Sequence, residues 1–106
     1  MKLWVDDVRV APMGYVWARS VNVAKSIIVK QERKFKRSGK LADSVELLDL
    51  DHDAGVYAKD GGDYIRLMDW LEETGRSYPI RLHTMNAVGR DNMMRIIRHN
   101  NWPMVM

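Results

Sequence analysis

The stretch LDLDHDAG (residues 48–55) sets three aspartates and a histidine among leucines and ends at a glycine. The apolar residues Val45, Leu47 and Leu48 lead into it, so the sequence predicts a buried strand over residues 45–50. Such a strand has no structural need for carboxylates and an imidazole at its end. The segment therefore indicates both a sheet and a place where a functional site would lie.

Length and composition are those of one small domain. The chain has 106 residues, of which 46% are hydrophobic and 29% charged, so we expect a single domain over residues 1–106. No apolar run approaches the ~20 residues that span a bilayer, and the N-terminal MKLWVDDVRV lacks the layout of a signal peptide. The absence of cysteine fits a reducing, cytoplasmic location.

Strand and helix patterns alternate along the chain. Residues 8–14 form a predicted loop, because Pro12 and Gly14 interrupt them. The expected strands cover 2–5, 15–19, 45–50, 79–82 and 102–105, and the expected helices cover 22–37, a segment from an Asp63 cap to Gly75, and a last segment capped by Asn86. This order predicts an α/β fold, with a parallel five-stranded sheet sandwiched by about three helices and right-handed crossovers. Trp4 and Trp102, on predicted strands, are expected in the core.

Polar residues follow three of the predicted strands. Since ligands bind beyond the carboxyl ends of parallel strands, we expect these clusters to share one rim of the sheet. Converging carboxylates repel one another unless a cation or a proton lies among them, and their oxygens suit Mg²⁺ or Mn²⁺. The candidate metal ligands are Asp6, Asp7, Asp51 and Asp53. Nearby histidines leave Zn²⁺ open, and single aspartates also commonly cap loops.

His52 and His83 are the candidate catalytic residues, because imidazole suits acid–base chemistry near neutral pH. The alternative is a structural role, in which each ring bonds to nearby backbone. The run HTMNAVGR (83–90) leads into a helix whose N-terminus can attract an anion. The candidate phosphate-binding residues are Arg9, Thr84, Asn86, Gly89 and Arg90.

A basic run lies at residues 30–40, KQERKFKRSGK, with six basic residues and one acid. Lys34, Lys36 and Arg37 are candidate contacts for nucleic acid, since cations in such a run displace counterions from phosphates. The simpler alternative is the solvated end of a helix.

Several motifs together indicate a family. The segments are VDDVRVAP (5–12), GYVWARS (14–20), LDHDAG (50–55), GGDYIRLMDWLEE (61–73) and HTMNAVGRDNM (83–93). In this order, over nearly the whole chain, they resemble the cyclic-phosphate processing receiver-like domains. That family shows an LDDxRxxP stretch, an LDHDLG motif and HSxNPxG before a final helix. The matching positions are Asp6, Asp7, Arg9, Asp51, His52, Asp53, His83, Asn86 and Gly89, while Ala54, Thr84 and Ala87 depart from the pattern.

The resemblance implies a flavodoxin-like fold, similar to response-regulator receivers, with the first receiver helix missing or reduced. It also implies action on a cyclic phosphate, such as the 2′,3′-cyclic phosphate of a cleaved RNA end, in RNA repair or conflict. We therefore expect a phosphoesterase assisted by a divalent cation, Mg²⁺ or Mn²⁺. Two alternatives are a non-catalytic module that binds a cyclic nucleotide or RNA end, and a degenerate receiver used for protein interaction.

A phosphorylatable receiver is a weaker match. Asp6, Asp7, Asp51 and Thr84 would fill four of its roles, but the C-terminal WPMVM offers no lysine for the fifth. Two histidines would also have no task in aspartyl phosphorylation.

Overall fold

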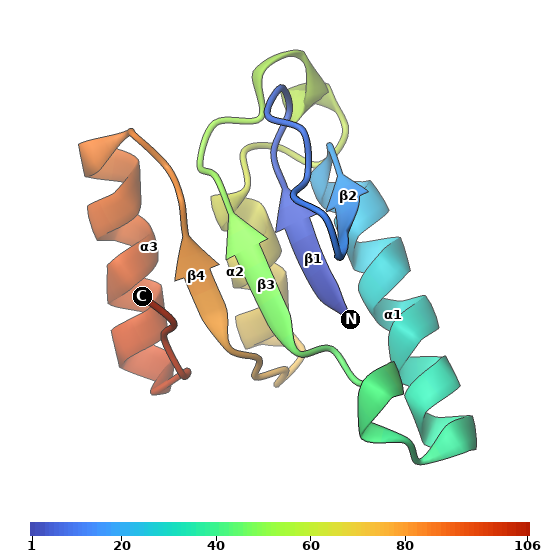
Figure 1. The fold of residues 1–106 in the computed structure, drawn as a ribbon. Helices are drawn as coiled ribbons and strands as arrows, with labels where there is room; N and C mark the ends of the chain where they lie inside the picture. The colour runs from blue at the N-terminus through green and yellow to red at the C-terminus, as the bar shows by residue number, and fades with distance from the viewer.

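Four parallel strands form one sheet in the order β2-β1-β3-β4, in a computed structural model that describes all of residues 1–106 (Figure 1). The strands are β1 (Lys2–Val5), β2 (Tyr15–Ala18), β3 (Leu47–Leu50) and β4 (Ile80–Leu82). Leu3 pairs with Val16 on one side and Leu48 on the other, so β1 lies inside the sheet. The parallel α/β fold expected from the alternating pattern is confirmed.

Three helices accompany the sheet: α1 (Val21–Ser38), α2 (Ile65–Glu73) and α3 (Ala87–Asn100), with short 3₁₀ turns at Leu41–Asp43 and Gly55–Lys59. Ser20 caps α1 by accepting a hydrogen bond from Val23 N (3.1 Å). Asn86 caps α3, and this cap was predicted. The expected Asp63 cap of α2 is wrong. Its carboxylate accepts a hydrogen bond from Ala54 N (2.9 Å) instead, and α2 begins after Tyr64.

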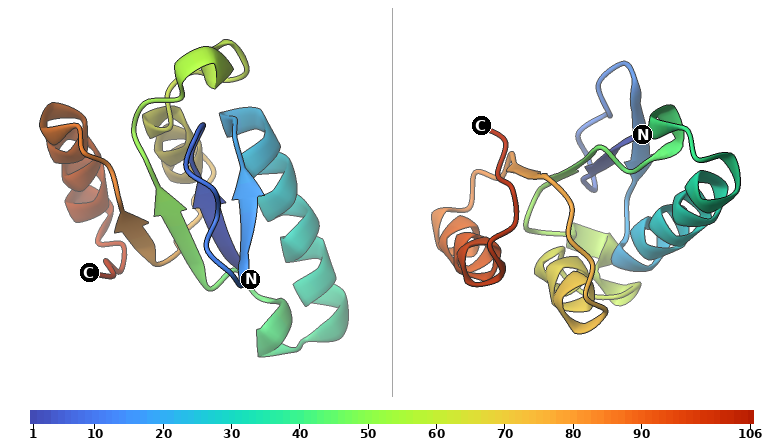
Figure 2. Two further views of the ribbon diagram at one scale, coloured as in Figure 1. Left: turned by 45° about the horizontal axis from the view of Figure 1, so that its top comes forward. Right: turned by 90° about the horizontal axis from the view of Figure 1, so that it is seen from below.

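The helices form one layer, which corrects the predicted sandwich (Figure 2). The crossovers through α1 and α2 each step toward the β4 edge of the sheet, and so does α3, which leads to a bridge between Met104 and Ile80. Right-handed crossovers that step in one direction place their helices on one face. The β1–β2 connection alone steps the other way, and residues 6–14 contain no helix there.

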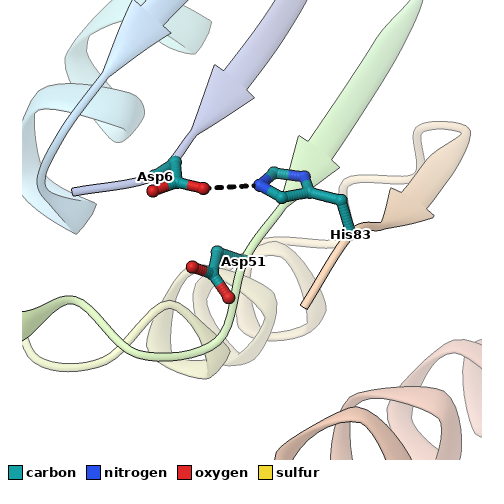
Figure 3. Close-up of side chains that lie close together, drawn as sticks. All are labelled: Asp6, Asp51 and His83. Atoms are coloured by element: carbon teal, nitrogen blue, oxygen red, sulfur yellow. Dashed lines mark hydrogen bonds and ion pairs between the residues drawn. The ribbon is translucent and has the colours of Figure 1, made fainter. Parts of the chain in front are cut away.

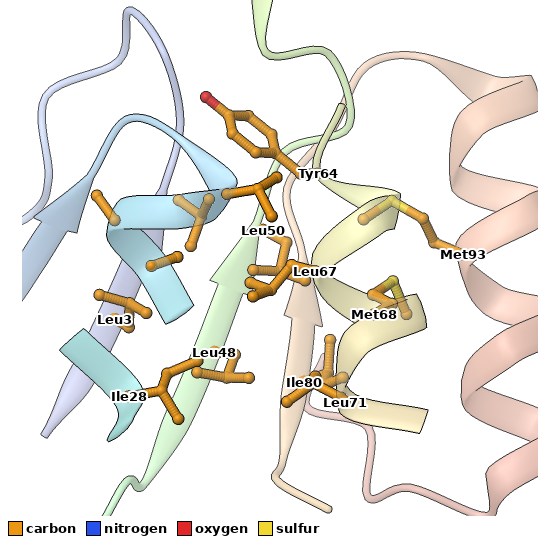
Figure 4. Close-up of a cluster of buried hydrophobic side chains, with 14 of the residues drawn as sticks. Leu3, Ile28, Leu48, Leu50, Tyr64, Leu67, Met68, Leu71, Ile80 and Met93 are labelled. Atoms are coloured by element: carbon orange, nitrogen blue, oxygen red, sulfur yellow. The ribbon is translucent and has the colours of Figure 1, made fainter. Parts of the chain in front are cut away.

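Alternation along the strands separates the two faces. The helix-covered face presents Leu3 and Val5 of β1 and Leu48 and Leu50 of β3, all with no exposed surface. They join the amphipathic stripe of α2 in one core cluster of 19 buried residues (Figure 4). Met93 of α3 extends this cluster at its far side. Period-2 strands and a period-3.6 helix therefore meet in a single core.

A fifth strand is not formed, in contrast to the prediction over residues 102–105. The C-terminal segment makes a single parallel bridge between Met104 and Ile80. Val105 N donates to Ile80 O (2.8 Å), and Ile80 N donates to Pro103 O (2.9 Å). Trp102 is buried, as expected. None of the helices combines the length and apolar character that a membrane span requires.

The opposite face, which we call the open face, carries Lys2, Trp4, Tyr15, Asp49 and Arg81. Trp4 is only half-buried there, so its predicted place in the core is wrong. Its neighbours in sequence, Leu3 and Val5, hold the core positions because adjacent strand residues point to opposite faces.

Candidate functional site

The candidate site lies at the carboxyl rim of the sheet, between β1 and β3. The chain leaves β1 toward one edge and leaves β3 toward the other, so these adjacent strands form a topological switch point. Ligands of parallel α/β sheets bind at such points because the diverging loops open a crevice. Asp6 follows β1 directly, and Asp51 follows β3. The predicted shared rim is therefore present in the fold.

Three side chains converge at this rim (Figure 3). Asp6, Asp51 and His83 each offer a ligand atom, and these atoms all lie within 4.8 Å of one another. The Nε2 atom of His83 is 2.9 Å from Oδ2 of Asp6, although 77 positions separate the two residues. We call these three residues the rim cluster.

Asp6 is completely buried and is held by its own loop. Its Oδ1 accepts hydrogen bonds from Val8 N (3.0 Å) and Arg9 N (2.9 Å). Burial alone would raise the pKa of Asp6, but these N–H groups and His83 outweigh it and lower the pKa. The carboxylate therefore stays ionised and fixed in place.

His83 lies between two carboxylates, because its Nδ1 is 2.7 Å from Oδ1 of Asp49 while its Nε2 faces Asp6. Its ring also stacks on Trp4, with centroids 3.8 Å apart and planes 3° apart. Asp49, which is 1% exposed, thus orients the imidazole from behind. Asp49 was not among the predicted site residues, although a carboxylate inside a buried strand, two residues before Asp51, was a signal for it.

His52 belongs to a different group of side chains. Its Nδ1 is 2.8 Å from Oδ1 of Asp53, and Asn86 Nδ2 donates to the same carboxylate (3.2 Å to Oδ2). The bond from His52 lowers the pKa of Asp53, and Asn86 adds to the shift against a raising effect of burial. The Nε2 atom of His52 has no hydrogen-bond partner, so it is free to exchange a proton with a ligand.

Gly89 makes this position of His52 possible. A Cβ atom at Gly89 would lie 2.4 Å from Cγ of His52 and 2.5 Å from Cδ2. Only glycine therefore lets the imidazole pack directly against the first turn of α3. Gly89 thus contacts His52, and its predicted role toward phosphate stays a prediction.

Asp7 and Asp53, the other two predicted metal ligands, lie outside the rim cluster. Asp7 instead packs against Gly55, where an added Cβ would come within 2.5 Å of its Oδ2. The negative charge of the region still acts on its surroundings. Burial, and then the charges of Asp7, Asp6, Asp51 and Asp63, raise the pKa of Tyr64.

The donor set of the rim cluster fits a hard divalent cation. The two carboxylate oxygens suit Mg²⁺ or Mn²⁺, and the imidazole nitrogen leaves Zn²⁺ open. The 2.9 Å between Asp6 Oδ2 and His83 Nε2 matches the spacing of about 3 Å between neighbouring ligands when each is about 2.1 Å from an octahedral Mg²⁺. These three residues could therefore hold a cation, with His83 in place of Asp7 and Asp53.

The predicted phosphate-binding residues surround the same rim. Arg9 Nη1 donates to His83 O (3.1 Å), and Arg90 Nη1 donates to Leu82 O (3.1 Å). The hydroxyl of Thr84 accepts a hydrogen bond from Asn86 N (3.1 Å). Each of these side chains already stabilises the loop after β4 or the loop after β1. Their role toward phosphate stays a prediction.

The basic run lies away from this rim. Lys34, Lys36 and Arg37 occupy the C-terminal half of α1, which runs from the carboxyl rim toward the opposite end of the sheet (Figure 1). Lys34 Nζ is 3.4 Å from Oδ1 of Asp43, while Lys36 and Arg37 stand in the last turn. They complement the dipole of α1, and a contact with nucleic acid remains a prediction.

No curated protein and no solved structure matches the chain. Residues 1–99 match the model of one family, the cyclic-phosphate processing receiver domain. This range runs from before β1 into the last turn of α3 and contains every residue of the rim cluster. The fold places Asp6, Asp51 and His83 at one switch point. On the family match, the chain belongs to the cyclic-phosphate processing receiver domain family.

Proposed function

We propose that this domain is a phosphoesterase that opens a cyclic phosphodiester, with the 2′,3′-cyclic phosphate of an RNA end as its substrate class. The observation that carries the proposal is the convergence of the rim cluster, together with the His52–Asp53 pair that follows Asp51 directly in the chain. Membership of a cyclic-phosphate processing family supports the same chemistry. An RNA-repair or conflict role in the cytoplasm would follow from that substrate.

The reaction adds water across one P–O bond. The oxygen of water attacks phosphorus, one bond to a ribose oxygen breaks, and the products are a phosphomonoester and a free ribose hydroxyl. One group must accept the proton of water, and another must donate a proton to the departing ribose oxygen. Negative charge on the phosphoryl oxygens must be stabilised meanwhile.

We assign proton transfer on one side of the phosphorus to His52. Asp53 accepts the hydrogen bond from Nδ1–H and so fixes the tautomer that leaves Nε2 free as a base. Gly89 holds the ring against α3, so this nitrogen has one orientation. Arg9 and Arg90 lie close enough to the rim to contribute positive charge toward the phosphate.

His83 can serve in one of two ways. A divalent cation held by the rim cluster would supply positive charge to the phosphoryl oxygens, with Nε2 of His83 as one ligand. Without a cation, the same Nε2 carries a proton toward Asp6 and is the acid for the departing oxygen. One nitrogen cannot do both at once, so the metal dependence of turnover distinguishes these roles.

The test is turnover of a short RNA that ends in 2′,3′-cyclic phosphate, with EDTA or with added Mg²⁺ or Mn²⁺. His52→Ala and His83→Ala are compared with His99→Ala, whose exposed histidine lies in the last turn of α3. We expect ring opening that both of the first two changes abolish and the third leaves unchanged. Binding of the RNA end without product formation would instead favour the non-catalytic module. A chain that neither binds nor cleaves would favour the interaction domain.

A further inference from the structure

A pocket of about 420 Å³ opens on the open face, next to the candidate site. It is lined by Trp4, Pro12, Tyr15, Asp49, Arg81 and His83. The strand residues come from all four strands, and no helix covers this face because every helical crossover lies on the other one. Trp4 and Asp49 orient His83, and the remaining lining residues, Pro12, Tyr15 and Arg81, have no task in the proposed chemistry.

Two aromatic side chains form a wall of the pocket. Tyr15 meets the Trp4 ring edge to face, with centroids 5.9 Å apart and planes at 79°. The indole Nε1–H of Trp4 donates to Arg9 O (2.9 Å), which fixes the orientation of the ring. Fixed aromatic rings of this kind bind flat conjugated ligands by stacking or edge contact.

The polar groups of the pocket are an acceptor and a donor. Oδ1 of Asp49 bonds to His83, while its Oδ2 makes no hydrogen bond in the protein and keeps a small exposed surface, since no fully buried side-chain oxygen or nitrogen lacks a partner. Arg81 is the register partner of Asp49 on β4, and its guanidinium makes no hydrogen bond or ion pair. An acceptor that is largely shielded from water favours a ligand that donates to it. Each nucleobase carries an N–H donor and a ring-nitrogen or carbonyl acceptor at its edge, which complements this pair.

The pocket and the rim cluster share one residue. His83 belongs to both, since Nε2 faces Asp6 at the rim and Nδ1 faces Asp49 in the pocket. In a nucleotide, a ribose links the nucleobase to the phosphate, just as His83 links the pocket to the rim cluster. A nucleotide bound with its phosphate at the rim would therefore reach the pocket with its base.

We propose that this pocket receives the nucleobase of the substrate, with Trp4 and Tyr15 as the aromatic wall and Asp49 and Arg81 as the hydrogen-bonding pair. The inference rests on the proposed function, because it takes the phosphate to bind at the rim. It makes the substrate a nucleotide, rather than any small cyclic phosphate.

The first experiment is an NMR titration of ¹⁵N-labelled protein with uridine 3′-monophosphate, compared with ribose 5-phosphate, which lacks a base. We expect the indole N–H signal of Trp4 to shift, while that of Trp70, on α2 in the helix layer, stays in place. The nucleotide should bind about fivefold to 160-fold more tightly than the sugar phosphate, the range that stacking of one base supplies. Equal affinities, or a stationary Trp4 signal, would overturn the proposal.

The matched variants are Arg81→Ala in the pocket and Arg95→Ala on the exposed face of α3. Arg81→Ala should weaken binding of the nucleotide several-fold and leave that of ribose 5-phosphate unchanged, because stacking remains, and Arg95→Ala should change neither. An Arg81→Ala protein that keeps the full preference for the nucleotide would contradict the pocket. A Tyr15→Leu protein, which removes one aromatic ring, should lose part of the same preference.

A kinetic arm separates this inference from the proposed function. Glycerol 1,2-cyclic phosphate has the same five-membered ring and no base. If it is opened as fast as a 2′,3′-cyclic nucleotide, the phosphoesterase stands and the base pocket fails. If no cyclic phosphate is opened but the nucleotide still binds through Trp4 and Arg81, the pocket stands and the phosphoesterase fails.

Discussion

The two faces of one four-stranded sheet differ in what their residues do. Leu3 and Leu48, on the helix-covered face, have no exposed surface and contact only the core. Trp4 and Asp49 follow them directly in sequence, yet they orient His83 from the open face. In this small domain one face supplies the stability and the other positions polar groups, because the helical crossovers all step in one direction and so lie on one face.

The largest expected effect is on the helix-covered face. Leu48→Ala should reduce the free energy of unfolding by about 2–5 kcal/mol, since it leaves a cavity inside a packed core. Arg81→Ala, one strand away on the open face, should change it by less than about 0.5 kcal/mol. Urea unfolding followed by circular dichroism measures both. Similar losses for the two variants would mean that the two faces do not differ in this way.

Gly89→Ala tests the contact between the helix layer and the rim. The new Cβ would lie 2.4 Å from the His52 ring, so the ring must shift. We expect cyclic-phosphate turnover to fall about 100-fold, the order of loss for a 1 Å misplacement of a reacting group.

The fold should survive that change, because alanine favours a helix more than glycine does, by up to about 1 kcal/mol. The control is Val88→Ala, at the neighbouring and 73% exposed position. Unchanged turnover in Gly89→Ala would remove His52 from the mechanism.

A pH-dependent pair supports the helix layer. Glu32 of α1 accepts hydrogen bonds from Arg76 (Nη2 to Oε1, 2.9 Å) and from the hydroxyl of Tyr78. Burial would raise the pKa of Glu32, but Arg76 and Tyr78 lower it below its ordinary value of 4.5. The pair therefore stabilises the protein above pH 4.5, and this contribution is lost as the pH falls through the lower pKa of the folded state.

Glu32→Gln should accordingly cost about 1–2 kcal/mol at pH 7, and the difference from the unchanged protein should shrink below pH 4.5. Unfolding by urea at several pH values measures this difference. Glu73→Gln, at an exposed position of α2, is the control and should show little change at any pH. A Glu32→Gln penalty that is constant from pH 7 to pH 3 would contradict the assignment.

The smallest effect is expected from the basic run, at the far end of the molecule from the rim. The double change Lys36→Ala and Arg37→Ala should weaken binding of a single-stranded RNA modestly and uniformly across sequences. It should reduce the slope of log K against log salt by about 0.7 for each RNA phosphate that the protein no longer neutralises. An unchanged slope would indicate that these cations are solvated at the last turn of α1 and do not contact the RNA.

Much of the fold could be predicted because the apolar residues recur with the period of 2 of a strand and the period of 3.6 of a helix. The spacing of Tyr64, Leu67, Met68 and Leu71 predicts the buried stripe of α2, and all four are buried. The rule for parallel strands brought Asp6, Asp51 and His83 to one rim, as the structure shows. The single layer of helices was missed, since it depends on the order of strands in the sheet, which local patterns do not contain.

The site was predicted in outline and not in detail. Which carboxylates converge depends on the path of each loop after its strand. Asp7 and Asp53 lie outside the rim cluster. Trp4 was expected in the core because it is a large aromatic residue on a strand. The alternation with Leu3 and Val5 could have placed it on the other face.

The pairing of β1 with both β2 and β3 also bears on how the domain folds. Leu3 of β1 pairs with Leu48 of β3. These two central strands can pair only after the chain that contains α1 has brought β3 back beside β1. Such non-local pairing slows folding relative to local hairpins and helices. A nascent chain that ends within α1 therefore lacks both β3, the central partner of β1, and His83, the partner of Asp6. The rim cluster can form only late in synthesis, once β4 and His83 have been made.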